Sequence, residues 1–555
     1  MTIIKSFFQA SHPKKKIYLG IIVFLCVVIW MILLTQGMPF YDPDDWDHVL
    51  ISDDTPWKLM IQNFITPWST SENWVAQASM MDQVRNKRVF LGIVLKSITG
   101  VFGYKFFPYY LFSKVLFFAG TITLLFLILV SLNSSYRYAI TGALFYLLVP
   151  ANYLHALWIS VPETMAHFFI LLSVYLYLNL GISLDQGNLK FSYWRTLGFL
   201  FIAGWFAMKT KETAVILPLM LLAFTSFRFR RWSLHKVPLA GLILVLVYLA
   251  FLIFPVTNLG MPGTTFNWRI PFRLLLRNYN CGYADEPTSA FISFDHIWPV
   301  SMARTIGLPL LWIIAVFVFM YWFNRFFRRH VYSIQFLKHP IVGISVFWML
   351  IELFLMGFFQ PDPRYFSGTM IPMTILISCL IYCVVHQFQK SWFKKIWSCI
   401  VIIVVIWTLF ENFRHVIWRR QQMGQRGNTF MNVAKVIYQD QFPNKPFTMR
   451  DLGLYYCPTY VPPPVTRPHL KKVTYYIGLG YTIWDKADGS LQEFDRFSKY
   501  GVVYYATDNP GELSDQDQVK LLAALPRVNE SSLFEFLLYK LKRKKPTPFY
   551  VFKHL

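Results

Sequence analysis

Long apolar runs recur along the sequence, and they restrict the chain to a helical membrane protein. Because a helix rises about 1.5 Å per residue, about 20 apolar residues cross a hydrocarbon core of about 30 Å. Lipid offers the backbone no hydrogen bonds, so runs of this length form helices inside a bilayer. We expect about eleven spans, near 17–37, 106–131, 137–153, 163–182, 193–208, 213–227, 237–256, 304–324, 340–359, 366–386 and 396–411.

The composition fits a membrane protein and not a soluble one. Only 15% of the 555 residues are charged, against about 25% in soluble domains. The formal net charge of +24 does not require nucleic acid, because short cytoplasmic loops of membrane proteins collect Lys and Arg. Anionic lipid or lipid phosphate is the nearer partner, so we expect a lipid partner and no nucleic acid.

Basic loops set the expected orientation. Clusters at 14–16, 228–231, 325–329 and 390–395 all fall on one side of the membrane if these spans are right. By the positive-inside rule that side is the cytoplasm. No small-residue cleavage site follows the first run, so we expect a retained anchor. The outer side receives the loop 38–105, the loop near 152–162, the turn 209–212, the loop 257–303, residues 360–365 and the tail.

The tail is polar and predicts a separate outer domain. We divide the chain into a transmembrane domain, 1–411, and a small extracytoplasmic α/β domain, 412–555. Periodicity predicts helices near 429–441 and 514–525, and strands at 472–477, 501–507 and 549–552.

An acidic cluster follows the first span, where the chain leaves the membrane. It consists of Asp42, Asp44, Asp45, Asp47 and His48. Packing like charges at a membrane surface costs free energy, so the cluster is a candidate for chemistry. A carboxylate there can deprotonate a hydroxyl. Two alternatives stay open: Asp42 and Asp47 as caps of a turn or helix, and a divalent cation on Asp44 and Asp45.

Cations are expected on the same outer side. Arg85 and Arg88 precede the second span, Lys211 lies between the fifth and sixth, and Arg364 opens the tenth. Arg and Lys hold phosphate and stabilise it as it leaves. The alternative is that these side chains only anchor helix ends at the interface, or that Arg364 pairs with Asp362. Similarly, Glu163 at the start of a span complements a helix N-terminus or binds an acceptor.

In this order the residues resemble the C-type glycosyltransferases, multi-spanning enzymes whose donors are polyprenyl-phosphate sugars. Relatives include the lipid A aminoarabinose transferase and the protein O-mannosyltransferases. The resemblance covers about residues 15–390, and one departure is the first loop, where four Asp stand in place of two acidic residues. The matching motifs are Asp44-Asp45 with His48, Arg85-x-x-Arg88 through Gly103-Tyr104, Lys211-Glu212 with Pro218, and Arg364-Tyr365 with Pro372.

The resemblance implies an inverting glycosyltransferase of the bacterial inner membrane, with its site on the periplasmic face. It would transfer a hexosyl or pentosyl group to lipopolysaccharide, another envelope glycan or a protein. The general base is Asp45 or Asp44; we choose Asp45, because the spacing to His48 places both on one side of a helix. The donor phosphate would be bound by Arg85, Arg88, Lys211 and Arg364. The acceptor would be bound, or the site supported, by Asp47, His48, Glu163 and Tyr365. We expect no cofactor, with the divalent cation as the alternative.

Two rival functions remain. A transporter or flippase for a lipid-linked substrate needs charges inside spans and two related halves, whereas the charges here gather at the expected outer rim and no repeat is visible. A polymer ligase of the same topology is the other rival.

A disulfide is also predicted. Cys281 and Cys457 are the only cysteines on the expected outer side, in an oxidising compartment where disulfides persist. We expect them to pair and clamp the tail, with two free thiols as the alternative.

Overall fold

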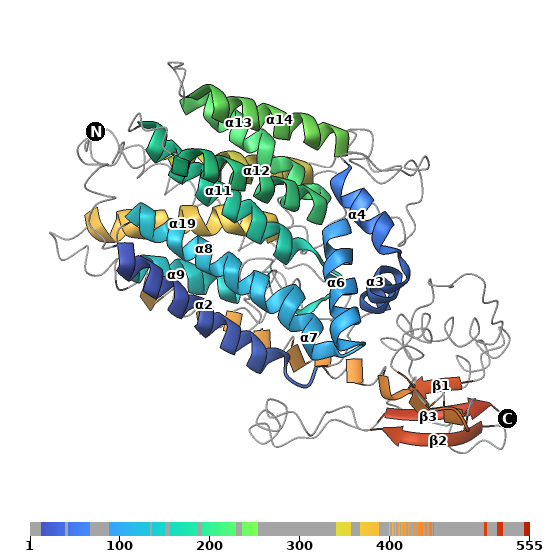
Figure 1. The fold of residues 1–555 in the computed structure, drawn as a ribbon. Coiled ribbons are helices and arrows are strands. Elements are labelled where there is room, and N and C mark those ends of the chain that lie inside the picture. Colours follow the sequence, from blue (N-terminus) through green and yellow to red (C-terminus); the bar gives the residue numbers. More distant parts are fainter. Residues whose placement is uncertain are drawn as a thin grey trace.

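The fold was analysed in a computed structural model, which is mostly helical (Figure 1). It describes residues 13–38, 43–66, 88–133, 136–149, 152, 156–185, 191–228, 236–253, 340–356, 367–387, individual positions from 399 to 448, 504–507, 519–525 and 549–554.

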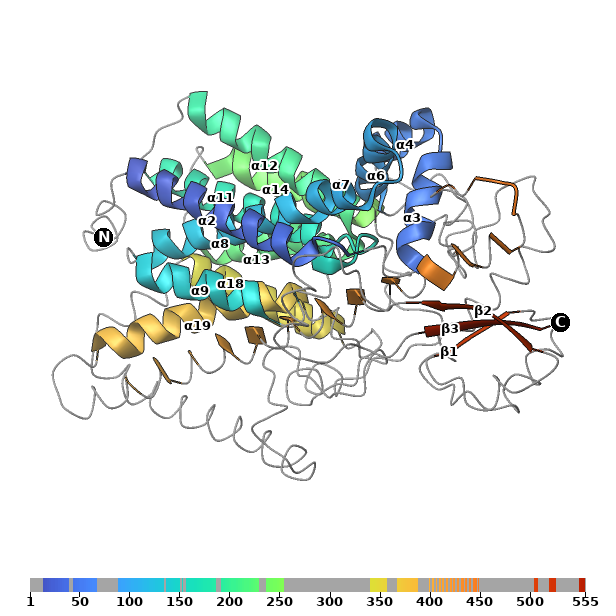
Figure 2. The ribbon, with the colours of Figure 1, turned by 90° about the horizontal axis from the view of Figure 1, so that it is seen from below.

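Long helices run alongside one another and form a bundle (Figures 1 and 2). Within the described residues, three stretches are long and apolar enough to cross a membrane: Lys16–Thr35, Phe107–Leu132 and Glu163–Leu180. The chain is therefore a polytopic membrane protein. The long helices are α2 (Pro13–Thr35), α8 (Leu116–Asn133), α9 (Tyr136–Leu148), α11 (Glu163–Asp185), α12 (Phe191–Thr210), α13 (Ile216–Arg228), α14 (Val237–Ile253), α18 (Pro340–Met356) and α19 (Ser367–Gln387).

These helices agree with most of the expected spans. The run 304–324 lies outside the described residues, so the total of about eleven stays a prediction. The second span is not uniform: α7 (Phe106–Tyr110) continues through a π-helical turn, η2 (Leu111–Val115), into α8. Turns of this kind are rare and occur mostly at functional sites.

The segment expected as the first outer loop, 38–105, contains three helices. They are α3 (Pro43–Asp54), α4 (Trp57–Ile65) and α6 (Val89–Phe102), which gather at one end of the bundle (Figures 1 and 2). The Asp53 carboxylate accepts a hydrogen bond from the Tyr104 hydroxyl at 2.5 Å, and Lys96 donates to the Asp53 carbonyl oxygen. Asp53 therefore ties α3 to α6 and is structural.

Glycines allow the helices to approach closely. A Cβ added at Gly142 of α9 would collide with the Ser378 hydroxyl of α19 and would lie 2.6 Å from a methyl carbon of Leu129 on α8. Likewise, a Cβ at Gly120 of α8 would lie 2.6 Å from the Phe168 ring of α11. Helices in lipid associate through such close packing, because no hydrophobic force drives them together there.

A three-stranded antiparallel sheet lies at the same end of the molecule as α3 (Figures 1 and 2). Its order is β1 (Tyr504–Thr507), β3 (Phe549–His554), β2 (Val519–Leu525), with an irregularity between Leu521 and Ala523. The strand expected at 549–552 is confirmed, and the one expected at 501–507 is confirmed over its described part, 504–507. The helix expected at 514–525 is wrong, because pairing with β3 overrides the helix preference of the Leu and Ala residues in 519–525. The predicted strand 472–477 lies outside the described residues.

The first part of the tail packs against the first span. Every described position from 399 to 440 is helical. The fully buried Arg420 donates to the carbonyl oxygens of Leu34 at 2.9 Å and Gln36 at 2.7 Å. Arginine thus satisfies carbonyls that a helix C-terminus leaves without intrahelical partners. The division at 411 stays a prediction.

We expect Gly142→Ala to destabilise the bundle. Its methyl group meets side chains of both α19 and α8, and overpacking costs about 1–3 kcal/mol. The midpoint of thermal unfolding in detergent should fall. Gly198→Ala in α12 is the control, since nothing lies within 4 Å of the added Cβ; equal midpoints for the two variants would contradict the packing described here.

Candidate active site at one end of the bundle

Asp45, the third residue of α3, is fully buried. One carboxylate oxygen accepts a hydrogen bond from the Ser160 amide at 2.7 Å. Ser160 belongs to residues 156–162, a buried segment before α11 that we call the strap. His48 follows one turn later and is also buried, so the helix on which the choice of Asp45 depended is present. The carboxylate therefore points into the protein.

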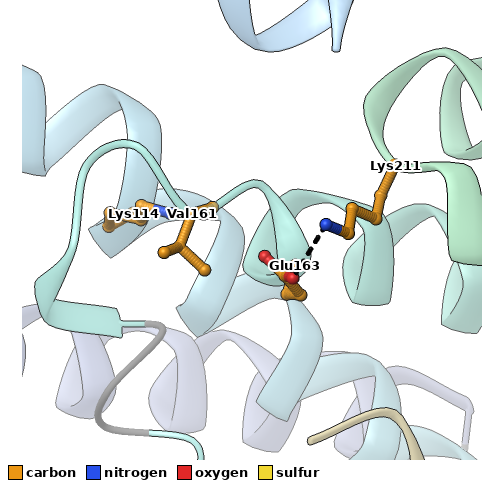
Figure 3. A network of polar contacts seen from close by, with 4 residues as sticks. All are labelled: Lys114, Val161, Glu163 and Lys211. Carbon is orange, nitrogen blue, oxygen red and sulfur yellow. Dashed lines mark hydrogen bonds and ion pairs between the residues drawn. The ribbon is translucent and has the colours of Figure 1, made fainter. Parts of the chain in front are cut away.

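Glu163 and Lys211 form a buried ion pair (Figure 3). Glu163 opens α11, and Lys211 directly follows α12, before the short η3 (Glu212–Val215). The ammonium nitrogen of Lys211 lies 3.2 Å from a carboxylate oxygen of Glu163, and the side chains are 4% and 11% exposed. Lys211 is consequently a buried partner of Glu163 and not an exposed interfacial anchor.

Lys114, in the π-helical turn η2, was missed by the sequence analysis. It is fully buried and donates a hydrogen bond to the Val161 carbonyl oxygen of the strap. Figure 3 shows Lys114 and Lys211 reaching residues 161–163 from opposite sides. The sequence could have pointed to Lys114, because a lysine inside an apolar span is rare and is a functional-site candidate by default. The cations chosen from the sequence all lie near the ends of expected spans.

Electrostatic interactions join these residues into one group. The charge of Lys114 interacts with those of Glu163, Asp45 and Arg88, where Arg88 is the half-buried residue that caps the N-terminus of α6. We call Asp45, Arg88, Lys114, Glu163 and Lys211 the charge cluster. It contains three basic and two acidic side chains, and interactions among buried charges are strong because little water screens them.

Two other polar residues have structural roles. Lys209 donates to the carbonyl oxygens of Asn63 at 2.8 Å and Thr66 at 2.5 Å, and so binds the C-terminus of α4. The ring nitrogen Nδ1 of His167 lies 3.3 Å from the Tyr146 hydroxyl. His167 is thus a packed helix histidine.

Several predicted site residues lie outside the part of the chain that the structure describes. They are Arg85, Arg364 and Tyr365, and the two cysteines of the expected disulfide, Cys281 and Cys457. For Asp44 and Asp47 the structure describes only the backbone, which lies in α3. Among the described residues, no three His, Cys, Asp or Glu side chains come together to hold a metal ion.

Comparisons with known proteins give little beyond this geometry. No family and no curated protein matches the chain. Among solved structures it is similar to ArnT from Cupriavidus metallidurans bound to undecaprenyl phosphate, with 13% identity and a TM-score of 0.43 over 98% of this chain and 99% of that chain. With an identity and a TM-score this low, the similarity carries no argument about chemistry, which follows from the residues of the site.

We expect the Glu163–Lys211 pair to show strong coupling in a double-mutant cycle. Glu163→Gln and Lys211→Met each leave one buried charge without this partner, and breaking a buried pair costs about 3–5 kcal/mol. The double variant should lose less stability than the two single losses together, by about 0.5–3 kcal/mol. The free energy of unfolding in detergent is measured for the wild type, the two single variants and the double variant. Lys58→Met on exposed α4 surface is the control for loss of a lysine; additive losses would show that the pair is not coupled.

Proposed function

We propose that this protein is an integral-membrane glycosyltransferase that moves a sugar from a polyprenyl-phosphate donor to an acceptor hydroxyl. The observation that carries the proposal is the buried Asp45 carboxylate, held by the Ser160 amide at 2.7 Å within a cluster of three cations. Transfer of a sugar from a phosphate requires a general base close to cations. The base accepts the acceptor's proton, and the cations stabilise the departing phosphate.

The reaction then proceeds by direct displacement. The acceptor hydroxyl gives its proton to Asp45, and its oxygen attacks the anomeric carbon from the face opposite the phosphate. The bond between that carbon and the phosphate oxygen breaks, and its electron pair leaves with the lipid phosphate. Attack opposite the leaving group inverts the anomeric centre. Arg88 and Lys211 would neutralise the phosphate, with Arg85 and Arg364 as the further ligands expected from the sequence.

Asp45 suits the role of base better than Glu163. The Asp45 carboxylate is oriented by a neutral amide, whereas Glu163 is bound to an ammonium group at 3.2 Å. The ammonium group of Lys211 thus occupies the Glu163 carboxylate directly and competes there with an acceptor hydroxyl. Asp44 stays the alternative base, and His48, Asp47 and Tyr365 the supporting or acceptor-binding residues.

A divalent cation on Asp44 and Asp45 is not needed by this mechanism. The charge of Lys114 acts on Asp45, and a positive surrounding opposes the binding of another cation. The cations of the charge cluster can also neutralise a single phosphate group.

The proposed location is a bacterial inner membrane, with the site on the periplasmic face. The Lys-rich start of α2 and the helix α3 lie at opposite ends of the bundle (Figure 2). If the lysine-rich end is cytoplasmic, the charge cluster faces the periplasm. Acceptors there include lipopolysaccharide, other envelope glycans and proteins.

A flippase for a lipid-linked anion is the second candidate. Charged residues inside spans are typical of transport pathways. Here Lys114 lies within the second span, and the buried Glu352 lies in apolar α18, where it accepts a hydrogen bond from the Trp348 indole at 3.2 Å. Transport of a labelled lipid in vesicles without sugar transfer would favour this candidate.

The decisive variant is Asp45→Asn, which keeps the shape of the side chain and removes its charge. Purified protein is incubated with radiolabelled polyprenyl-phosphate sugars and a membrane extract as acceptor source. Loss of a general base should lower the transfer rate by about 10²-fold or more, while donor binding stays largely intact. Asp54→Asn makes the same change at an exposed position of the same helix and should transfer normally.

Asp44→Asn separates the two candidate bases. If Asp44→Asn is inactive and Asp45→Asn transfers normally, their roles are reversed. If both variants transfer normally, α3 supplies no base and the glycosyltransferase proposal fails at this site.

A further inference from the structure

We propose that Lys114 is a positioning residue for this reaction, which fixes the strap that orients Asp45 and keeps that carboxylate ionised. The inference rests on the proposed function and deepens it. It starts from the strap, because residues 156–162 are all buried. Residues 158–162 are non-helical, and the polar backbone groups of such a buried segment need hydrogen-bond partners.

Two side chains of the second span supply partners for the strap. The Tyr110 hydroxyl donates to the Leu157 carbonyl oxygen at 2.6 Å, and Lys114 donates to the Val161 carbonyl oxygen. Tyr110 and Lys114 are four residues apart, and so are the carbonyls they bind. The second span thus holds both ends of the strap, and between them the Ser160 amide reaches Asp45.

A hydrogen bond alone does not account for the lysine. The neutral Tyr110 hydroxyl already performs the same task for Leu157, whereas burying an ammonium group costs far more than burying a hydroxyl. The charge is favourable only where anions are near. Asp45 from α3 and Glu163 from α11 interact with it, and Arg88 at the start of α6 opposes it.

Lys114 is also better placed to position the site than to bind substrate. Its ammonium group already donates a hydrogen bond to the Val161 carbonyl oxygen of the strap. In addition, Glu163 is already paired with Lys211 at 3.2 Å. The charge of Lys114 interacts with Glu163 first and with Asp45 next. Because Glu163 has the Lys211 ammonium beside it as well, loss of Lys114 should leave Glu163 ionised and act on Asp45, where a nearby cation favours the ionised form that a base requires.

The test compares loss of charge with loss of a hydrogen bond. Lys114→Gln keeps a donor for the Val161 carbonyl and loses the charge, and Lys114→Met loses both. Tyr110→Phe is the matched control, since it removes the neighbouring hydrogen bond and no charge. For each protein the transfer rate at saturating donor is measured against pH, together with the donor KM and the thermal midpoint.

Without the cation, Asp45 becomes protonated at higher pH. The acidic limb of the pH–rate profile should therefore move to higher pH by about one unit in both Lys114 variants. At neutral pH the rate should fall, with donor KM changed less than about threefold, the pattern of an interaction that acts on the chemical step. Tyr110→Phe should lower the thermal midpoint and leave the acidic limb of the pH–rate profile at its wild-type pH. Lys114→Arg, which keeps the charge, should also leave the acidic limb at its wild-type pH.

The outcomes separate this inference from the proposed function. An active wild type whose acidic limb is unmoved in Lys114→Gln and Lys114→Met overturns the positioning role and leaves the glycosyltransferase proposal standing. If Lys114→Met does not fold, Lys114→Gln decides alone, because it retains the hydrogen bond to the strap. A wild type that transfers sugar from no polyprenyl-phosphate donor overturns both.

Discussion

The buried pair of Glu163 and Lys211 is the interaction on which the rest of the site depends. It joins the first residue of α11 to the residue that follows α12, in surroundings where neither charge has much water. Because a buried charge is costly without a partner, the two helix ends are fixed relative to each other. The strap runs directly into Glu163, so its path is fixed as well. The position of Ser160, and with it that of Asp45, follows from this contact together with the hydrogen bonds of Tyr110 and Lys114 to the strap.

Most of the long helices were predictable because a bilayer imposes one simple requirement, an apolar run of sufficient length. The pairing of Asp45 and His48 on one helix face was predictable for a similar reason, since helical spacing is fixed. Other features depend on contacts between distant segments. Lys114 was overlooked because its role requires a carbonyl that is 47 residues away. The strand at 519–525 was taken for a helix because only pairing with β3 makes it extended.

The site combines rigid and irregular elements. Asp45, Lys114 and Glu163 each lie on a helix or helical turn, which holds a side chain more firmly than a loop does. The strap between them is irregular backbone, which membrane proteins tolerate only where protein surrounds it. The Ser160 amide is therefore a fixed hydrogen-bond donor. Tyr110 and Lys114 supply hydrogen bonds to the buried carbonyl groups of the strap.

The contact of Arg420 with the end of α2 has a consequence for biogenesis. Arg420 and Gln36 are separated by 384 residues, which at about 5–20 residues per second means about 20–80 seconds of translation. During this time α2 has been made but its last carbonyls have not met the guanidinium that binds them. Asp45 lies only nine residues beyond Gln36. The end of α2, which leads into the first helix of the site, therefore gains this contact only after nearly the whole membrane bundle has been synthesised.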